Sequence, residues 1–244
     1  MMVSFIIPAY NEESMLPSTI QSIHAASQEN GIEYEIVVAD DNSDDDTAKV
    51  AREHGAIVVS AKNRQIAATR NAGARASTGE YLIWVDADTR VSAVVVCKAI
   101  QALSLGAAGG GSRVAYDRPC PLYIRIGWSM LMLSYRIFGY ASGAFIFCTR
   151  TVFEEIGGFD ETRYAGEEIY MSRSIRKYGR FHWIKNPVLT SSRKLRSFSI
   201  LEVLMMCIHL ALGGHRGTQS RNHKDFWYGA RRADTIDPPT PPNE

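Results

Sequence analysis

Two carboxylates, Asp86 and Asp88, stand on alternate residues directly after the apolar run at residues 81–85. Alternate side chains of an extended chain point to the same side, so both carboxylates can face one ligand. Mg²⁺ and Mn²⁺ bind carboxylate oxygens and take further ligands from substrate phosphates. We therefore predict a divalent-metal site here. The alternative is a solvated turn in which Asp88 caps a helix beginning at Ser92.

A second acidic cluster, residues 40–43, also follows an apolar run, at residues 34–39. A carboxylate in this place can accept a hydrogen bond from a base imide or a ribose hydroxyl. The alternative is a group of helix-start acids favoured by the macrodipole. That alternative explains residues 44–46 well, but it explains Asp40 poorly because Asp40 stands at the end of the run itself.

These side chains need a scaffold that gathers the ends of strands. In the first ninety residues, short apolar runs (3–8, 34–39, 56–60, 81–85) alternate with helical patterns (11–26, 44–53, 66–76). Alternation of this kind predicts a parallel sheet with right-handed crossovers. Ligands bind outside the carboxyl ends of such strands, which selects residues 8–12, 40–43, 63–70 and 86–88.

The second half is less regular. We expect helices at residues 92–103, 167–178 and 198–212, a strand at 144–148, and a flexible turn at 109–111. The apolar segments at 123–138 and 198–212 suit a membrane interface, and they suit core or dimer packing equally well. The Pro-rich residues from 233 onward predict a disordered tail.

Charge and cysteine content exclude several classes of protein. The net charge of +1 gives no electrostatic reason to expect a nucleic-acid partner, although residues 193–232 alone carry eight basic and two acidic residues. Four widely spaced cysteines suggest free thiols in a reducing cytosol rather than zinc or disulfides. With no signal-like N-terminus and no run of about 20 uncharged apolar residues, we expect a cytoplasmic location.

Five motifs occur in order: FIIPAYNEE at 5–13, VVADDNSDDDT at 37–47, ATRNAGARASTGEYLIWVDADT at 68–89, GGFDE at 157–161 and GEEIYMSRSIRKYG at 166–179. Together they resemble glycosyltransferase family 2. The resemblance implies an α/β fold of the GT-A type, with a Rossmann-like, mostly parallel sheet flanked by helices and a C-terminal acceptor-side helical portion. It also implies a nucleotide-sugar donor, favoured to be a UDP-sugar, and Mn²⁺ or Mg²⁺.

The resemblance further implies a nucleotide pocket made by Pro8, Ala9, Tyr10, Glu12, Asp40, Asp41, Arg70 and Asp86. Asp40 would contact the nucleobase of the donor, with Asp41 beside it. Arg70 would lie near the nucleotide or diphosphate, Asp86 near the ribose or metal, and Asp88 on the metal itself.

The pair Glu167-Glu168 matches an acidic pair of the family whose second member is the catalytic base. The family has Asp where this chain has Glu168, so both Glu167 and Glu168 are candidates, with Glu168 first. Acids that complement a helix N-terminus are the alternative. Arg193 or Lys194 could hold the diphosphate or could be solvated charge. Gly157 and the residues after it are a turn near the site or a plain helix stop.

We therefore expect one GT-A domain at 1–192, with a nucleotide half at about 1–90 and an acceptor half at about 91–192. A basic, apolar helical extension at 193–232 and the tail at 233–244 would follow. The acceptor would carry a hydroxyl, on a lipid, a polysaccharide, a protein or a small molecule. A lipid-linked acceptor would favour contact with the inner face of the membrane, and a homodimer is the alternative use of the apolar segments.

Three rival functions make different predictions. A nucleotidyltransferase would carry a Gly-rich basic loop after the first strand, where this chain has Ala9, Tyr10, Asn11 and Glu12. A dinucleotide oxidoreductase would carry GxGxxG after a strand, and none occurs. A non-catalytic sugar-nucleotide-binding or scaffold protein would not need its acids, so it predicts that Glu168→Gln leaves function unchanged.

Overall fold

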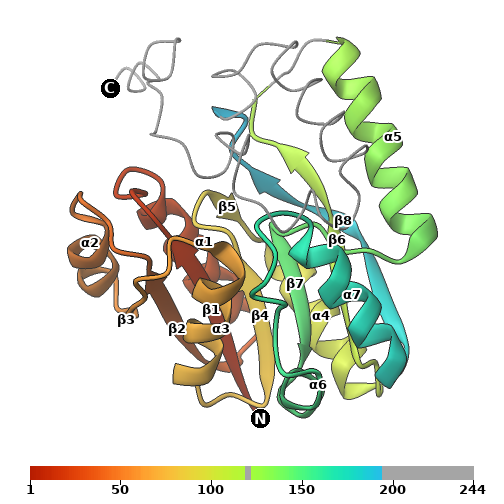
Figure 1. The fold of residues 1–244 in the computed structure, drawn as a ribbon, viewed down its shortest axis with the longest axis horizontal. Helices are drawn as coiled ribbons and strands as arrows, with labels where there is room; N and C mark the ends of the chain where they lie inside the picture. The colour runs from red at the N-terminus through yellow and green to blue at the C-terminus, as the bar shows by residue number, and fades with distance from the viewer. Residues whose placement is uncertain (119–121, 194–244) are drawn as a thin grey trace.

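The computed structural model describes residues 1–118 and 122–193, and within them it has one mixed sheet flanked by helices (Figure 1). The strands are β1 (Met2–Ala9), β2 (Glu33–Asp40), β3 (Ile57–Ser60), β4 (Tyr81–Val85), β5 (Thr89–Arg90), β6 (Gly109–Tyr116), β7 (Phe145–Thr149) and β8 (Phe181–Thr190). The helices are α1 (Leu16–Glu29), α2 (Thr47–Glu53), α3 (Ile66–Ala76), α4 (Ala93–Ser104), α5 (Leu122–Phe138), α6 (Arg150–Ile156) and α7 (Glu167–Tyr178).

The strand order is β3-β2-β1-β4-β7-β6-β8-β5. The first four strands are parallel, as the alternating pattern predicts, and the register pairs Ala9 with Asp40. Strand β7 runs antiparallel to β4 and β6, and β6 is parallel to β8. The sheet is therefore parallel in the N-terminal half and mixed in the C-terminal half.

Strand β1 is apolar throughout because helices cover both of its faces. Phe5 and Ile7 belong to a core shared with α1 and α4, whereas Ile6 belongs to a second core shared with α3. Trp84 of β4 lies in this second core, 5.2 Å from the ring of Phe159. A strand buried on both faces has no polar alternation, which explains the continuous apolar run in the sequence.

The expected turn at residues 109–111 is wrong, because these glycines begin the buried strand β6. A Cβ at Gly110 would lie 2.0 Å from the carbonyl oxygen of His182, and one at Gly109 would lie 2.4 Å from that of Phe147. The glycines therefore permit close approach to both neighbouring strands rather than flexibility.

Two helices, α1 and α2, begin later than the sequence pattern predicts, whereas α3 and α7 begin at the predicted residues. Helix α2 begins at Thr47, and its N-cap residue Asp46 makes no side-chain cap hydrogen bond. Helix α1 begins at Leu16. Before it, Asn11 has a φ of 51°, which is not helical, and residues 13–15 form a turn. In the part of the chain that the structure describes, no helix is both long and apolar enough to cross a membrane. The predicted helix at 198–212 and the predicted tail lie outside the described residues.

Candidate active site

The carboxyl ends of β1 and β2 place the first predicted nucleotide residues together. Pro8 and Ala9 end β1, beside the end of β2. The hydroxyl of Tyr10 donates to Asp44 at 3.2 Å, and the guanidinium carbon of Arg64 lies 3.8 Å from the centre of the Tyr10 ring. The loop after β1 is therefore tied to the loop after β2, as the strand-end rule predicts.

Asp40 and Asp41 have different surroundings although they are neighbours. Asp40 Oδ1 accepts hydrogen bonds from the amide and hydroxyl of Ser43, and among the described residues no donor reaches its Oδ2. Asp41 accepts from three backbone amides, those of residues 63, 64 and 65, at 2.8–3.0 Å, and from the Thr69 hydroxyl at 2.9 Å. Asp41 thus holds the loop that enters α3, while Asp40 keeps an oxygen for a ligand.

Glu12 and Arg193 meet across 181 residues of chain. Arg193 Nη2 donates to Glu12 Oε2 at 2.7 Å, and the two side chains are 19% and 4% exposed. The Glu12 amide also donates to the Thr47 hydroxyl at 2.8 Å. Arg193 therefore lies against the predicted nucleotide residues, whereas Lys194 lies outside the described residues.

Asp86 and Asp88 follow β4 at the centre of the sheet. Asp86 Oδ1 accepts from Arg70 Nη2 at 3.0 Å, and Asp88 Oδ1 accepts from the Thr190 hydroxyl at 3.2 Å. The Asp86 side chain is 32% exposed, and no described donor reaches its Oδ2. Within the described ranges no group of three or more His, Cys, Asp and Glu side chains is arranged so that it could hold a metal ion on its own. Two carboxylates nevertheless suit Mg²⁺ or Mn²⁺, because substrate phosphates complete the shell.

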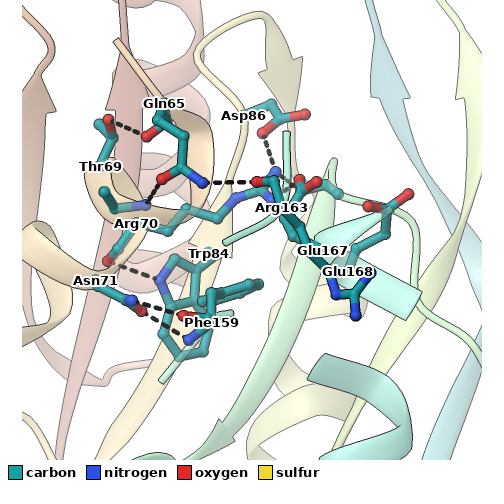
Figure 2. A network of polar contacts seen from close by, with 12 residues as sticks. Gln65, Thr69, Arg70, Asn71, Trp84, Asp86, Phe159, Arg163, Glu167 and Glu168 are labelled. Atoms are coloured by element: carbon teal, nitrogen blue, oxygen red, sulfur yellow. Dashed lines mark hydrogen bonds and ion pairs between the residues drawn. The ribbon is translucent and has the colours of Figure 1, made fainter. Parts of the chain in front are cut away.

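Arg70 lies fully buried between the two halves of the site. Its Nη1 donates to Glu167 Oε1 at 2.7 Å, and its Nη2 donates to Asp86 and to the carbonyl of Gly143 at 3.2 Å (Figure 2). Burial alone would lower the pKa of Arg70, but the charges of Asp86 and Glu167 outweigh it and raise that pKa. A Cβ at Gly143 would lie 2.7 Å from Nη2, so this glycine makes room for the guanidinium.

The two glutamates at the start of α7, like Asp40 and Asp41, differ in how many partners their carboxylates have within the protein. Glu167 is buried and paired with Arg70. Glu168 is half-buried, and its Oε1 lies 3.5 Å from the hydroxyl of Tyr135 on α5. Burial, followed by the charge of Glu167, raises the pKa of Glu168. Burial and the Glu168 charge also raise the pKa of Tyr135.

Sequence reasoning missed the residues that fix the loop before α7. Gln65 Nε2 donates to the carbonyls of Glu161 and Arg163, at 2.9 and 2.6 Å. Asn71 Nδ2 donates to the carbonyl of Phe159, and Asn71 Oδ1 accepts from its amide (Figure 2). Asn71 lies within the ATRNAG stretch of the third motif, which is the sequence signal that points to it. Gly157 ends α6 in the left-handed region, so the expected turn and helix stop are one feature.

The family model described as glycosyl transferase family 2 matches residues 4–157. This chain belongs to glycosyltransferase family 2. An uncharacterised glycosyltransferase of Mycobacterium tuberculosis is 32% identical over 137 residues, which are 55% of this chain and 59% of the relative. An undecaprenyl-phosphate 4-deoxy-4-formamido-L-arabinose transferase of Pseudomonas aeruginosa is 38% identical over 94 residues, 36% of this chain and 28% of the relative. The chain thus spans less than two thirds of the length of these relatives.

Solved structures confirm the GT-A-type fold of this family member. S. aureus TarS (residues 1–349) in complex with UDP-GlcNAc has a TM-score of 0.65 at 18% identity, over 93% of this chain and 70% of TarS. The mannosyltransferase PcManGT from Pyrobaculum calidifontis, in complex with GDP-Man and Mn²⁺, has a TM-score of 0.65 at 20% identity, over 87% and 62% of the two chains. At such identities the likeness establishes the fold alone.

Proposed function

We propose that this family 2 chain transfers a sugar from a nucleoside-diphosphate donor, favoured to be a UDP-sugar, to an acceptor hydroxyl with inversion. The observation that carries the proposal is that Arg70 donates hydrogen bonds to both Asp86 and Glu167. Through it, Asp86 after β4 is linked to Glu167, the neighbour in sequence of the proposed base Glu168. Family membership and the GT-A fold agree with this reaction class.

On the donor side, Asp40 offers a carboxylate oxygen that can accept a hydrogen bond from the nucleobase. It lies next to Pro8, Ala9 and Tyr10 at the end of β1. Asp41, next to Asp40 in the sequence, holds the loop that enters α3 and so supports the proposed nucleotide pocket from behind. Asp86 and Asp88 would hold Mn²⁺ or Mg²⁺, which when bound neutralises charge developing on the departing diphosphate. Mn²⁺ in the PcManGT complex supports this choice of ion.

Arg193 is proposed to bind the donor diphosphate, because it is a guanidinium at the edge of the predicted nucleotide pocket. Its pairing with the buried Glu12 holds it there before a ligand arrives. A guanidinium presents a planar fork of donors that matches the oxygens of a phosphate. Glu12 is then a residue that positions Arg193.

On the acceptor side, Glu168 is the base. It takes the proton of the acceptor hydroxyl while that oxygen forms a bond to the anomeric carbon. The bond from the anomeric carbon to the diphosphate breaks at the same time, and its electron pair leaves with the diphosphate. A single displacement inverts the anomeric configuration. Glu167 does not compete for this role, because its carboxylate is buried against Arg70.

Burial, followed by the charge of Glu167, raises the pKa of Glu168 to about 8, so its carboxylate is a stronger base than an ordinary glutamate once it is deprotonated. The acceptor is proposed to be lipid-linked or a polysaccharide. The name of the pseudomonad relative, which specifies undecaprenyl phosphate, supports the lipid-linked choice.

A thermal-shift experiment tests the donor site. The purified chain is heated with UDP, GDP or dTDP, each with Mn²⁺ or with EDTA. A ligand that binds only the folded state raises the melting temperature by mass action. We expect the largest increase with UDP and Mn²⁺. If no nucleotide raises the melting temperature with either metal, and direct binding agrees, the transferase proposal fails and a non-catalytic scaffold takes its place.

The base is tested by Glu168→Gln, with Glu154→Gln on the exposed face of α6 as the matched control. The substitution at Glu168 should keep the nucleotide-dependent shift and lose release of nucleoside diphosphate from the donor. The control should keep both. Equal activity of the two variants would remove Glu168 from the mechanism.

A further inference from the structure

Helix α5 has two apolar faces, and within residues 1–118 and 122–193 only one of them packs against other elements. On the inner face, Trp128 Nε1 donates to the carbonyl of Val114 at 3.1 Å, and its ring centre lies 4.9 Å from that of Tyr116. Met132 on the same face is 6% exposed. Tyr135, also on this face, reaches Glu168. These contacts fix the orientation of α5 about its axis.

The outer face carries a stripe of large apolar side chains. Its members, with 53–69% of their surface exposed, are Ile126, Met130, Leu133 and Ile137. At about 100° of rotation per residue, the four lie within about 60° of one another and opposite Tyr135. Figure 1 shows α5 at the outer edge of the molecule, beyond β6 and β8. Leu131 and Phe138 are also exposed on α5, outside the stripe. Ile57 on β3 and Val94 on α4 are exposed on separate elements.

The surroundings of the stripe are basic. Residues 118–138, which lead into and form α5, contain three arginines and no acid. Arg136 is exposed on α5 itself. At the C-terminal end of the helix, Arg176 Nη1 donates to the carbonyl of Phe138, and Arg173 donates to the hydroxyl of Tyr140 at 2.9 Å. Both of these arginines come from α7 and are exposed. An apolar stripe is thus flanked by fixed positive charge.

We propose that the outer face of α5 docks on an anionic membrane surface. The apolar stripe would enter the boundary between headgroups and acyl chains, while the flanking guanidinium groups bind lipid phosphates. Charge favours this occupant over two others. A second copy of the chain would bring one basic rim against another. Residues 195–232 of the same chain carry six Lys and Arg against two acids, so they would also bring positive charge against this rim.

This surface lies on the opposite side of α5 from Tyr135, whose hydroxyl contacts Glu168. The membrane and the proposed base would therefore lie on the two sides of a single helix. If the proposed transfer uses a lipid-linked acceptor, its headgroup would reach the site past the edge of α5. Membrane binding itself does not depend on the transfer reaction, so the two proposals can fail separately.

Vesicle sedimentation with the full chain tests the surface. One set of vesicles is phosphatidylcholine alone, and the other also contains phosphatidylglycerol. The test variant is Ile126→Ser/Met130→Ser/Leu133→Ser. The control, Ile57→Ser/Val94→Ser/Leu105→Ser, removes the same number of exposed apolar side chains from other elements. Circular dichroism and the melting temperature of each variant establish that it folds.

We expect wild type and control to bind the phosphatidylglycerol vesicles. The α5 variant should bind them at least about tenfold more weakly. Binding should also weaken with salt and in Arg136→Glu, which tests charge without changing the stripe. Equal binding of both triple variants overturns the proposal. So does absence of wild-type binding at low salt. In that case, a dimer that the α5 variant converts to monomer would assign the face to a second copy.

Discussion

Arg70 Nη1 donates a 2.7 Å hydrogen bond to Glu167 Oε1, and this contact joins α3 of the first half to α7 of the second. The two side chains are 2% and 8% exposed. Removing one partner of such a pair leaves a buried charge uncompensated, although replacing both with apolar groups costs far less. The contact should therefore dominate the effect of substitutions at this end of α7.

The first prediction concerns stability. Glu167→Ala should lower the free energy of unfolding by about 3–5 kcal/mol, because Arg70 stays buried with only Asp86 as a charged partner. Glu168→Ala should change it by less than about 1 kcal/mol, since Glu168 is half-buried and makes one long contact. Urea denaturation at neutral pH measures both. Equal losses in the two variants would show that Glu167 and Glu168 have not been assigned correctly.

The second prediction is the pH dependence of transfer. Burial and the charge of Glu167 raise the pKa of Glu168 above the ordinary 4.5 of a glutamate. A base must be deprotonated, so the rate should rise with pH until it passes the raised pKa. A kcat profile that runs from the acidic range into the mildly alkaline range, past a pKa of about 8, measures this. A profile that is already flat just above the ordinary glutamate pKa would contradict it.

The same raised pKa predicts an opposite trend in stability. The folded chain binds this proton more tightly than the unfolded chain does, so the contribution of Glu168 is full below the ordinary pKa and is lost as pH rises through the folded pKa. Glu168→Gln should match wild type at low pH and exceed it in melting temperature at higher pH. Melts of both proteins across pH, without donor, test this. A constant difference would refute the linkage.

The parallel half of the sheet could be predicted because its signals are local. Buried strands such as Tyr81–Val85 are continuous apolar runs, and polar residues follow each of them. Glycines at 109–111 could not be interpreted in this way, because the reason for them is the backbone of β7 and β8, far away in sequence. A local pattern of glycines gives the same signal for a turn and for a strand with close neighbours.

Membership of glycosyltransferase family 2 was predicted from the motifs and is confirmed. The sequence could not show which carboxylate of each acidic pair is bound by other groups of the protein. Asp40 and Asp41 are identical residues one position apart, and so are Glu167 and Glu168. Which carboxylate faces a buried partner depends on the rotation of a strand end or helix against the other half of the molecule. The contact between Glu12 and Arg193 depends likewise on tertiary structure.

The third prediction separates Asp40 from Asp41. Asp41→Asn should cost about 2–3 kcal/mol of stability, because an amide nitrogen cannot accept from the backbone amides of residues 63–65. Asp40→Asn should cost less than about 1 kcal/mol and should weaken nucleotide binding instead. Denaturation and calorimetric titration with UDP measure the two effects. Similar stability loss in both variants would count against this division.

The fourth prediction concerns the metal. EDTA should remove most of the increase in melting temperature that UDP gives with Mn²⁺, and Asp88→Asn should do the same with Mn²⁺ present, because an amide is a weaker ligand for a hard cation. The fold should persist, since the amide oxygen can still accept from Thr190. Thr190→Val is the control, because it removes that contact and keeps the carboxylate. If Thr190→Val lowers the shift as much as Asp88→Asn, Asp88 positions the loop after β4 and does not hold the ion.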